Sequence, residues 1–171
     1  MMNNTIKDNE MKSENINLLF VCLGNICRSP AAEGIMKKMI ADEGLADKIY
    51  VDSAGTSNWN EGKTPDKRMR MHGSKRGYDF CGAARTFRSS DFDKFDYIIA
   101  MDNNNYMNVK KLANTEEDVA KIYRMTDFSE NFADHDHVPD PYYGGDNGFN
   151  LVMDLLEDAS KGLIKEIKTK L

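Results

Sequence analysis

The feature that most constrains the fold is an alternation of short apolar segments with longer segments of helical periodicity. The apolar segments, each typical of a buried strand, are 17–21, 48–52, 97–101 and 121–125. Apolar residues recur at helical spacing over 30–43 and 149–171, and we expect two further helices, a basic, Met-containing one at 66–76 and one at 104–112. Strands that alternate with helices predict an α/β fold, in which helices cover both faces of a parallel sheet. Ligands of such sheets bind beyond the carboxyl ends of the strands.

The length and charge of the chain narrow the range of functions. Its 171 residues are enough for one domain with a hydrophobic core. We expect residues 1–16, which are polar, to be a loosely ordered leader and residues 17–171 to form the domain. The net charge of −5 does not favour nucleic-acid binding. No apolar run is long enough to cross a bilayer. From the charge and from this absence, we expect neither nucleic acid nor a membrane as a partner.

The cysteines indicate a reducing compartment. There are three, Cys22, Cys27 and Cys81, and an odd, small number is a poor disulfide framework. We therefore expect a cytoplasmic protein, with Cys81 in a structural role. A zinc site is not favoured, because Cys22 and Cys27 lack a second well-spaced pair and the segment 134–137 (Asp-His-Asp-His) reads as a solvated polar loop. No metal or cofactor is expected.

The segment with the clearest chemistry is the loop Cys22–Ser29, which connects the first strand to the first helix. In such a turn, successive backbone N–H groups and the positive end of the helix point at one place and form an anion site. Together with the guanidinium of Arg28, they favour the thiolate form of Cys22 at neutral pH. Arg28 can also hold two phosphate oxygens with its planar fork. The pattern therefore predicts a phosphate-binding loop with Cys22 as nucleophile.

Other residues of this loop have supporting roles. Gly24 permits a tight turn, Asn25 is a candidate for a left-handed backbone conformation, and Pro30 is expected to be the first helical residue. Ser29 can donate to the sulfur as it leaves, which lowers the barrier to breaking a phosphocysteine. The alternative, in which Cys22 only packs in the core, is the poorer interpretation of Cys-x5-Arg-Ser between a strand and a helix. The residues expected to contact phosphate are Leu23, Gly24, Asn25, Ile26, Cys27, Arg28 and Ser29.

The sequence closely resembles the low-molecular-weight protein tyrosine phosphatases. The matching segments, in the family's order, are Val21–Pro30, Val51–Gly55, Phe95–Ile99 with Met101-Asp102, and Asp140–Gly144. The resemblance implies a four-stranded parallel sheet flanked by helices, with the phosphate-binding loop after the first strand. It also implies a metal-free, two-step hydrolysis of aryl phosphates through phosphocysteine. Phosphotyrosine-containing proteins would be the substrates, and inorganic phosphate or other oxyanions would occupy the loop.

The resemblance also assigns residues outside the loop. Asp140 would be the general acid, and Ser53 would join Asn25 in the scaffold of the loop. The pocket wall would consist of Ile26, Trp59, Tyr142 and Tyr143. The residues themselves support Asp140, because the following proline favours an extended backbone and one positioned carboxyl can protonate a leaving phenol. Three further aspartates close in sequence leave this assignment open, and they are Asp134, Asp136 and Asp146.

Two residues outside the loop bear on its support. Gly82 stands where the family often has a histidine that supports the asparagine of the loop, so we expect Asn25 to rest on Ser53 and water alone. Asp102 follows the third strand, where it suits a helix N-cap or a loop support.

Several alternatives remain open. Cys27 captures oxidised Cys22 as an internal disulfide, or it is a small packing residue. A thiol-dependent arsenate reductase needs a relay of further cysteines, and only Cys81 lies downstream. A protein-arginine phosphatase is disfavoured because Ile26 presents a branched apolar wall. A catalytically silent phosphopeptide-binding module would need neither a nucleophile nor an acid.

Overall fold

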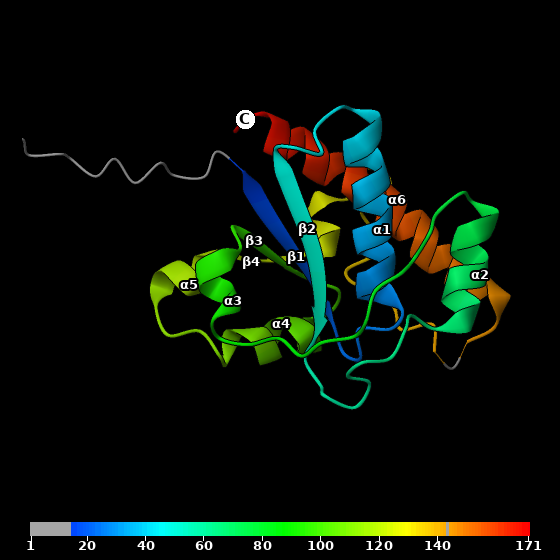
Figure 1. The fold of residues 1–171 in the computed structure, drawn as a ribbon, viewed down its shortest axis with the longest axis horizontal. Helices are drawn as coiled ribbons and strands as arrows, with labels where there is room; N and C mark the ends of the chain where they lie inside the picture. Colours follow the sequence, from blue (N-terminus) through cyan, green and yellow to red (C-terminus); the bar gives the residue numbers. More distant parts are fainter. Residues whose placement is uncertain (1–14, 143) are drawn as a thin grey trace, which may run out of the picture.

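The computed structural model describes residues 15–142 and 144–171, and Figure 1 shows them as a central sheet between two layers of helices. The sheet is four-stranded and parallel, with the order β2-β1-β3-β4. Its strands are β1 (Ile16–Cys22), β2 (Ile49–Gly55), β3 (Tyr97–Ala100) and β4 (Ile122–Arg124). The sequence therefore predicted both the class of the fold and the number of strands in this sheet correctly.

The helices are divided between the two faces of the sheet. They are α1 (Arg28–Asp42), α2 (Lys67–Lys75), α3 (Asp91–Lys94), α4 (Asn103–Lys110), α5 (Glu116–Ala120) and α6 (Asp146–Lys168), with a 3-10 helix η1 (Met125–Phe128) after β4. In Figure 1, α1, α2 and α6 lie together on one side of the sheet, and α3, α4 and α5 lie on the other. The two longest helices, α1 and α6, contact each other and cover one face.

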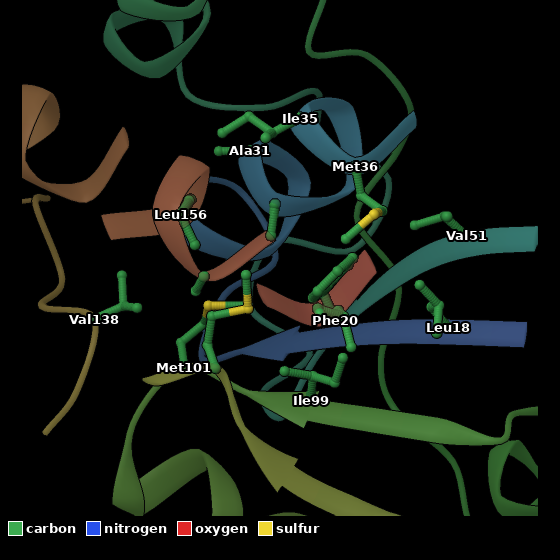
Figure 2. Close-up of a cluster of buried hydrophobic side chains, with 14 of the residues drawn as sticks. Leu18, Phe20, Ala31, Ile35, Met36, Val51, Ile99, Met101, Val138 and Leu156 are labelled. Carbon is green, nitrogen blue, oxygen red and sulfur yellow. The ribbon is translucent and has the colours of Figure 1, made fainter. Parts of the chain in front are cut away.

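Strand β1 is buried on both faces because it lies between two neighbours and between two layers of helices. Leu18 and Phe20 point toward the cluster that includes residues of α1 and α6, as Figure 2 shows, whereas Leu19 and Val21 belong to the cluster on the opposite face. All four side chains are fully buried. This explains why β1 reads as a continuous apolar run rather than as an alternating one.

The strand order also fixes where a ligand can bind. The chain passes from β1 through α1 to β2 on one side of β1, and then returns to β3 on the other side. The direction of winding thus reverses between β1 and β3. In parallel sheets, the crevice at such a reversal, beyond the carboxyl ends of the strands, is the usual place for a ligand. Cys22 is the last residue of β1 and lies at this place.

One helix start differs from the prediction. Pro30 is the third residue of α1 rather than the first, because the helix begins at Arg28. The prediction was wrong because proline is tolerated throughout the first turn, where backbone N–H groups have no intrahelical acceptor. Ala31 is the residue whose N–H first bonds back, to the carbonyl of Cys27. The helix thus continues directly from the loop.

The leader predicted at 1–16 lies mostly outside the described residues, since the description begins at residue 15. Ile16 already belongs to β1 and pairs with Ile49 of β2. Within the described residues, no helix combines the length and the apolar character that spanning a bilayer requires.

Candidate active site

The loop after β1 has the strained backbone that the sequence predicted. Asn25 has φ 55°, and it is the one non-glycine residue of the described chain with a positive φ. A left-handed residue in a turn reverses the chain and lets neighbouring N–H groups converge. Cys22, Asn25, Arg28 and Ser29 are all buried, at 2%, 4%, 3% and 0% exposure. These four side chains of the loop are therefore packed inside the protein, whereas Leu23 of the same loop is exposed.

Cys22 and Ser29 stand at the two ends of the loop in sequence, but their side chains lie next to each other. The sulfur of Cys22 lies 3.0 Å from the hydroxyl oxygen of Ser29. That is hydrogen-bond distance for a sulfur, and Ser29 is the first-turn residue that the sequence had singled out as a donor to it. A hydroxyl at this distance can donate a hydrogen bond to the sulfur.

Arg28 connects the loop to two other segments. Its Nη1 donates to Oδ2 of Asp102 at 2.6 Å and to the carbonyl of Val138 at 3.0 Å. Its Nη2 lies 3.7 Å from Oδ2 of Asp140. Burial alone would lower the pKa of Arg28, but the nearby Cys22 and the bond to Asp102 outweigh it and raise that pKa. The guanidinium is therefore a fixed positive charge beside the sulfur.

Asp102 has both of the roles that the sequence offered as alternatives, a helix N-cap and a support of the loop. Its Oδ1 accepts from the backbone N–H of Asn105, so it is the N-cap of α4, as predicted. Its Oδ2 holds Arg28, across 74 positions of sequence. The sequence did not predict Arg28 as the partner, because this bond depends on β1 and β3 being neighbours, which places the ends of both strands together.

Asn25 is held on three sides. Its Nδ2 donates to the hydroxyls of Ser29 at 2.8 Å and of Ser53 at 2.9 Å. Its Oδ1 accepts from the backbone N–H of Arg85 at 3.0 Å. The expectation that Asn25 rests on Ser53 and water alone was therefore wrong. Arg85 is itself fixed by ion pairs with Asp52 and Asp91. The expectation considered only the side chain missing at Gly82, whereas the support comes from a backbone N–H three residues later.

A cavity of about 230 Å³ opens directly above the loop. Its lining includes five residues of the loop besides Cys22, and four from other segments, namely Trp59, Asn60, Asp140 and Tyr142. Ile26, Trp59 and Tyr142, expected as pocket wall, are all among the lining residues, whereas Tyr143 lies outside the described residues. Asn60 was not predicted; it donates from Nδ2 to the carbonyl of Gly24 at 3.5 Å.

Among the four candidate aspartates, Asp140 is the one that lines this cavity. Asp134 and Asp136 point to solvent, with 85% and 96% of their side chains exposed, and each pairs with the histidine that follows it. Asp146 is 84% exposed and lies against His72. Geometry therefore separates Asp140 from its neighbours, which sequence proximity could not do.

The loop that carries Asp140 is held against α2. Oδ1 of Asp140 accepts from the backbone N–H of Tyr142 at 3.0 Å, and the carbonyl of Tyr142 accepts from Nη2 of Arg68 at 2.9 Å. The guanidinium of Arg68 also lies over the rings of Tyr142 and Phe149. Such cation–π contacts favour a fixed loop position. Arg68 was not among the predicted site residues.

The other two cysteines have different environments. Cys27 is 4% exposed and lines the same cavity as Cys22; burial, with the charge of Asp66, raises its pKa well above the usual range. Cys27 therefore remains a thiol at neutral pH. Cys81 is exposed, so the expectation of a structural role was wrong. No cluster of three or more possible metal ligands is found in the described parts of the chain.

Comparisons with known proteins agree with this geometry. Residues 17–171 match the family described as low molecular weight phosphotyrosine protein phosphatase. A relative from Synechocystis sp., assigned to the low molecular weight protein-tyrosine-phosphatases, is 50% identical over 90% of this chain and 98% of its own length. A crystal structure of a protein tyrosine phosphatase from Entamoeba histolytica with Hepes in the active site has a TM-score of 0.88 and 49% identity. The match covers 91% of this chain and 98% of that one.

A third similar protein is described as acting on a different phosphorylated residue. The crystal structure of a Drosophila arginine phosphatase has a TM-score of 0.81 and 34% identity, and covers 88% of this chain and 97% of that one. The family match spans nearly all the described residues, and the relatives are matched over almost their whole length. The chain therefore belongs to the low molecular weight phosphotyrosine protein phosphatases, a family of hydrolases that act through a phosphocysteine intermediate.

Proposed function

We propose that Cys22, Arg28 and Asp140 are the nucleophile, the phosphate anchor and the general acid of this phosphatase, and that phosphotyrosine in proteins is its substrate. The observation that carries the proposal is that all three side chains line one cavity at the carboxyl end of β1. A thiol, a guanidinium and a carboxyl around one space are the groups that a two-step phosphomonoester hydrolysis needs.

In the first step, the phosphate group rests on the loop. The N–H groups of residues 23–29 and the guanidinium of Arg28 hold its oxygens, and the Cys22 thiolate attacks phosphorus in line with the leaving phenol. A sulfur–phosphorus bond forms as the phosphorus–oxygen bond breaks. The leaving oxygen takes the proton of Asp140, so the products are phosphocysteine, a neutral phenol and the Asp140 carboxylate.

In the second step, water attacks the phosphocysteine. The Asp140 carboxylate takes a proton from this water, and the sulfur leaves as a thiolate that accepts a hydrogen bond from Ser29. Inorganic phosphate is released, and Asp140 is protonated again for the next cycle. Because the loop binds three oxygens around a central atom, inorganic phosphate and other oxyanions should compete with the substrate. The Hepes in the active site of the Entamoeba structure carries a sulfonate of this geometry.

The cavity favours an aromatic phosphate over other phosphorylated side chains. Ile26, Trp59 and Tyr142 supply apolar and aromatic surface on its walls, and a flat phenyl ring can stack on such surface. One solved relative is named an arginine phosphatase, so phosphoarginine is the second candidate. Ile26 favours phosphotyrosine, because a branched apolar side chain offers no partner to a polar guanidinium.

We also propose that the protein works in the reducing cytoplasm. The chemistry needs Cys22 as a free thiolate, and a second buried cysteine, Cys27, lines the same cavity. An oxidant that converts Cys22 to a sulfenic acid would let Cys27 form a disulfide with it, with loss of water. Activity would then be lost until a thiol reductant restores both cysteines.

The proposal is tested by kinetics on three peptides of identical sequence that carry phosphotyrosine, phosphoserine or phosphoarginine, with EDTA present. We expect kcat/KM for phosphotyrosine to exceed the other two by at least about 100-fold, a difference of roughly 2.7 kcal/mol. Cys22→Ser should abolish turnover but still bind vanadate, and Cys81→Ser is the matched control that stays active. A preference for phosphoarginine, or turnover by Cys22→Ser, would refute the proposal.

A further inference from the structure

Glu33 lies on α1 behind the phosphate loop, away from the cavity that would hold the substrate. Its Oε1 accepts from the hydroxyl of Ser53 at 2.9 Å, and its Oε2 accepts from Nζ of Lys37 at 2.8 Å. The Glu33 side chain is only 12% exposed. Burial alone would lower the pKa of Lys37, but the bond to Glu33 outweighs it and raises that pKa, which keeps Lys37 a cation beside Glu33.

A carboxylate can only accept hydrogen bonds, and this fixes the direction of the bonds that follow. Ser53 has a single hydroxyl proton, which it donates to Glu33. The Ser53 oxygen is then left as an acceptor, and it accepts from Nδ2 of Asn25. The amide of Asn25 is thereby oriented with its nitrogen toward the two serines and its oxygen toward the N–H of Arg85.

The same series of hydrogen bonds continues from Asn25 through Ser29 to Cys22. The second Nδ2 proton of Asn25 goes to the hydroxyl oxygen of Ser29, so that oxygen acts as an acceptor and its own proton is free to donate. Two acceptors are within reach of this proton. The sulfur of Cys22 lies at 3.0 Å and the carbonyl of Ala54 at 3.4 Å, so the sulfur is the nearer one.

The Ser53 hydroxyl bonds to Glu33 and Asn25, and it borders a cavity on its other side. A second cavity of about 220 Å³ lies behind the loop, and its lining includes Asn25, Glu33, Ser53 and Gly82. A Cβ added to Gly82 would meet no atom within 4 Å, so this side of the cavity is open space. Among the bonds found in the described chain, Glu33 is the acceptor that the Ser53 hydroxyl uses.

We propose that Glu33 is a positioning residue for catalysis, which acts through Ser53 and Asn25 to direct the Ser29 proton at the sulfur of Cys22. The inference rests on the function proposed above. Glu33 does not touch the substrate; its carboxylate sets the direction of a chain of four hydrogen bonds that runs from Glu33 to Cys22. Lys37 forms an ion pair with that carboxylate, 2.8 Å from its Oε2.

The chain should assist one of the two steps more than the other. A hydrogen bond to sulfur stabilises the thiolate, which is the leaving group when water attacks phosphocysteine. The same bond slightly lowers the reactivity of the thiolate as a nucleophile in the first step. Loss of Glu33 should therefore slow the breakdown of phosphocysteine and leave its formation nearly unchanged.

The experiment uses p-nitrophenyl phosphate as the probe, with steady-state and rapid-mixing kinetics on the full chain. We expect Glu33→Ala to lower kcat roughly tenfold, the size of one lost charge-assisted hydrogen bond. We expect kcat/KM to change by less than about threefold, since it reports the first step. A stoichiometric burst of nitrophenol should precede the slowed steady state. Ser53→Ala should behave alike, and the double variant no worse than either single one.

Two further variants separate positioning from a general loss of stability. Glu43→Ala removes an ion pair with Lys168 at the far end of α1 and should keep the wild-type kcat. Glu33→Gln combined with Lys37→Met gives Ser53 a neutral acceptor, the amide oxygen of the glutamine. Because Lys37 is removed, no cation draws that oxygen away from Ser53, and kcat should return to within about threefold of wild type.

Equal falls in kcat and kcat/KM, additive effects of the Glu33 and Ser53 changes, or an unchanged kcat would each overturn the inference. If Glu33→Ala does not fold, Ser53→Ala and the Gln–Met pair decide the matter with the same expectations. A wild-type protein that fails to hydrolyse p-nitrophenyl phosphate would refute the proposed function instead, so the two failures are distinguishable.

Discussion

Replacing Asp102 by asparagine would remove the charge that holds Arg28 while leaving the helix cap in place. Asp102 Oδ2 accepts from Arg28 at 2.6 Å, and Oδ1 accepts from the N–H of Asn105. Asparagine is as good an N-cap as aspartate, so α4 should keep its start. What is lost is the ionic character of a bond to a guanidinium that is only 3% exposed.

The size of the effect follows from the kind of bond. A hydrogen bond to a charged partner contributes roughly 1.5–3 kcal/mol and a neutral one roughly 0.5–1.5 kcal/mol. The difference is about 1–1.5 kcal/mol. If the transition state loses this much stabilisation, kcat/KM falls by about tenfold. Arg28 keeps its bond to the carbonyl of Val138, so it should not be lost from the site.

The assay is kcat/KM for p-nitrophenyl phosphate, with the inhibition constant of inorganic phosphate and the midpoint of urea unfolding. Asp102→Asn should weaken phosphate binding and catalysis together with little change in the urea midpoint. Asp102→Ala should lose the same activity and, in addition, about 1 kcal/mol of stability through the missing cap. Wild-type kcat/KM in Asp102→Asn would refute the reasoning that this carboxylate positions Arg28.

Three other predictions follow from the described contacts. Asp140→Ala should slow the hydrolysis of aryl phosphates by roughly 10²–10⁴, as expected for a general acid, whereas Asp134→Ala should not; a near-wild-type rate for Asp140→Ala would assign the acid elsewhere. Burial alone would raise the pKa of Asp158, but bonds from the backbone of Glu130 and Asn131 lower it. Asp158 therefore stabilises the fold above its unfolded-state pKa of about 3.9, and this is lost as the pH falls through the lower folded value. Asp158→Asn should be less stable by about 1 kcal/mol at neutral pH, with the gap closing in acid; a gap in urea unfolding that does not depend on pH would contradict this. Iodoacetamide at neutral pH should label Cys22 and Cys81 but spare Cys27, whose pKa is raised by burial and by Asp66. Mass mapping that finds Cys27 labelled ahead of Cys22 would count against that assignment.

The local features of the site could be predicted from the sequence. The apolar run of β1, the loop from Cys22 to Ser29 and the left-handed Asn25 all lie within fifteen residues, and their conformations depend mainly on neighbours in sequence. The periodicity of apolar residues and the preferences of turn-forming residues are sufficient to predict such features. The strand boundaries agreed to within about three residues for the same reason.

The long-range supports could not be predicted in this way. The bonds of Arg28 to Asp102 and of Asn25 to the N–H of Arg85 join residues 74 and 60 positions apart. They exist because β1 lies between β2 and β3, which brings the ends of three strands to one edge. The short helices α3 and α5, of four and five residues, were also missed, since so few residues carry no clear period.

The most direct test of this account is to identify the residue that carries the phosphate during turnover. Wild-type enzyme mixed with p-nitrophenyl phosphate would be stopped by a rapid denaturing quench and mapped by peptide mass spectrometry. The account predicts one phosphate on Cys22, which appears with the nitrophenol burst and is absent from Cys22→Ser. Phosphate on a different side chain, or continued turnover with the sulfur of residue 22 removed, would contradict it.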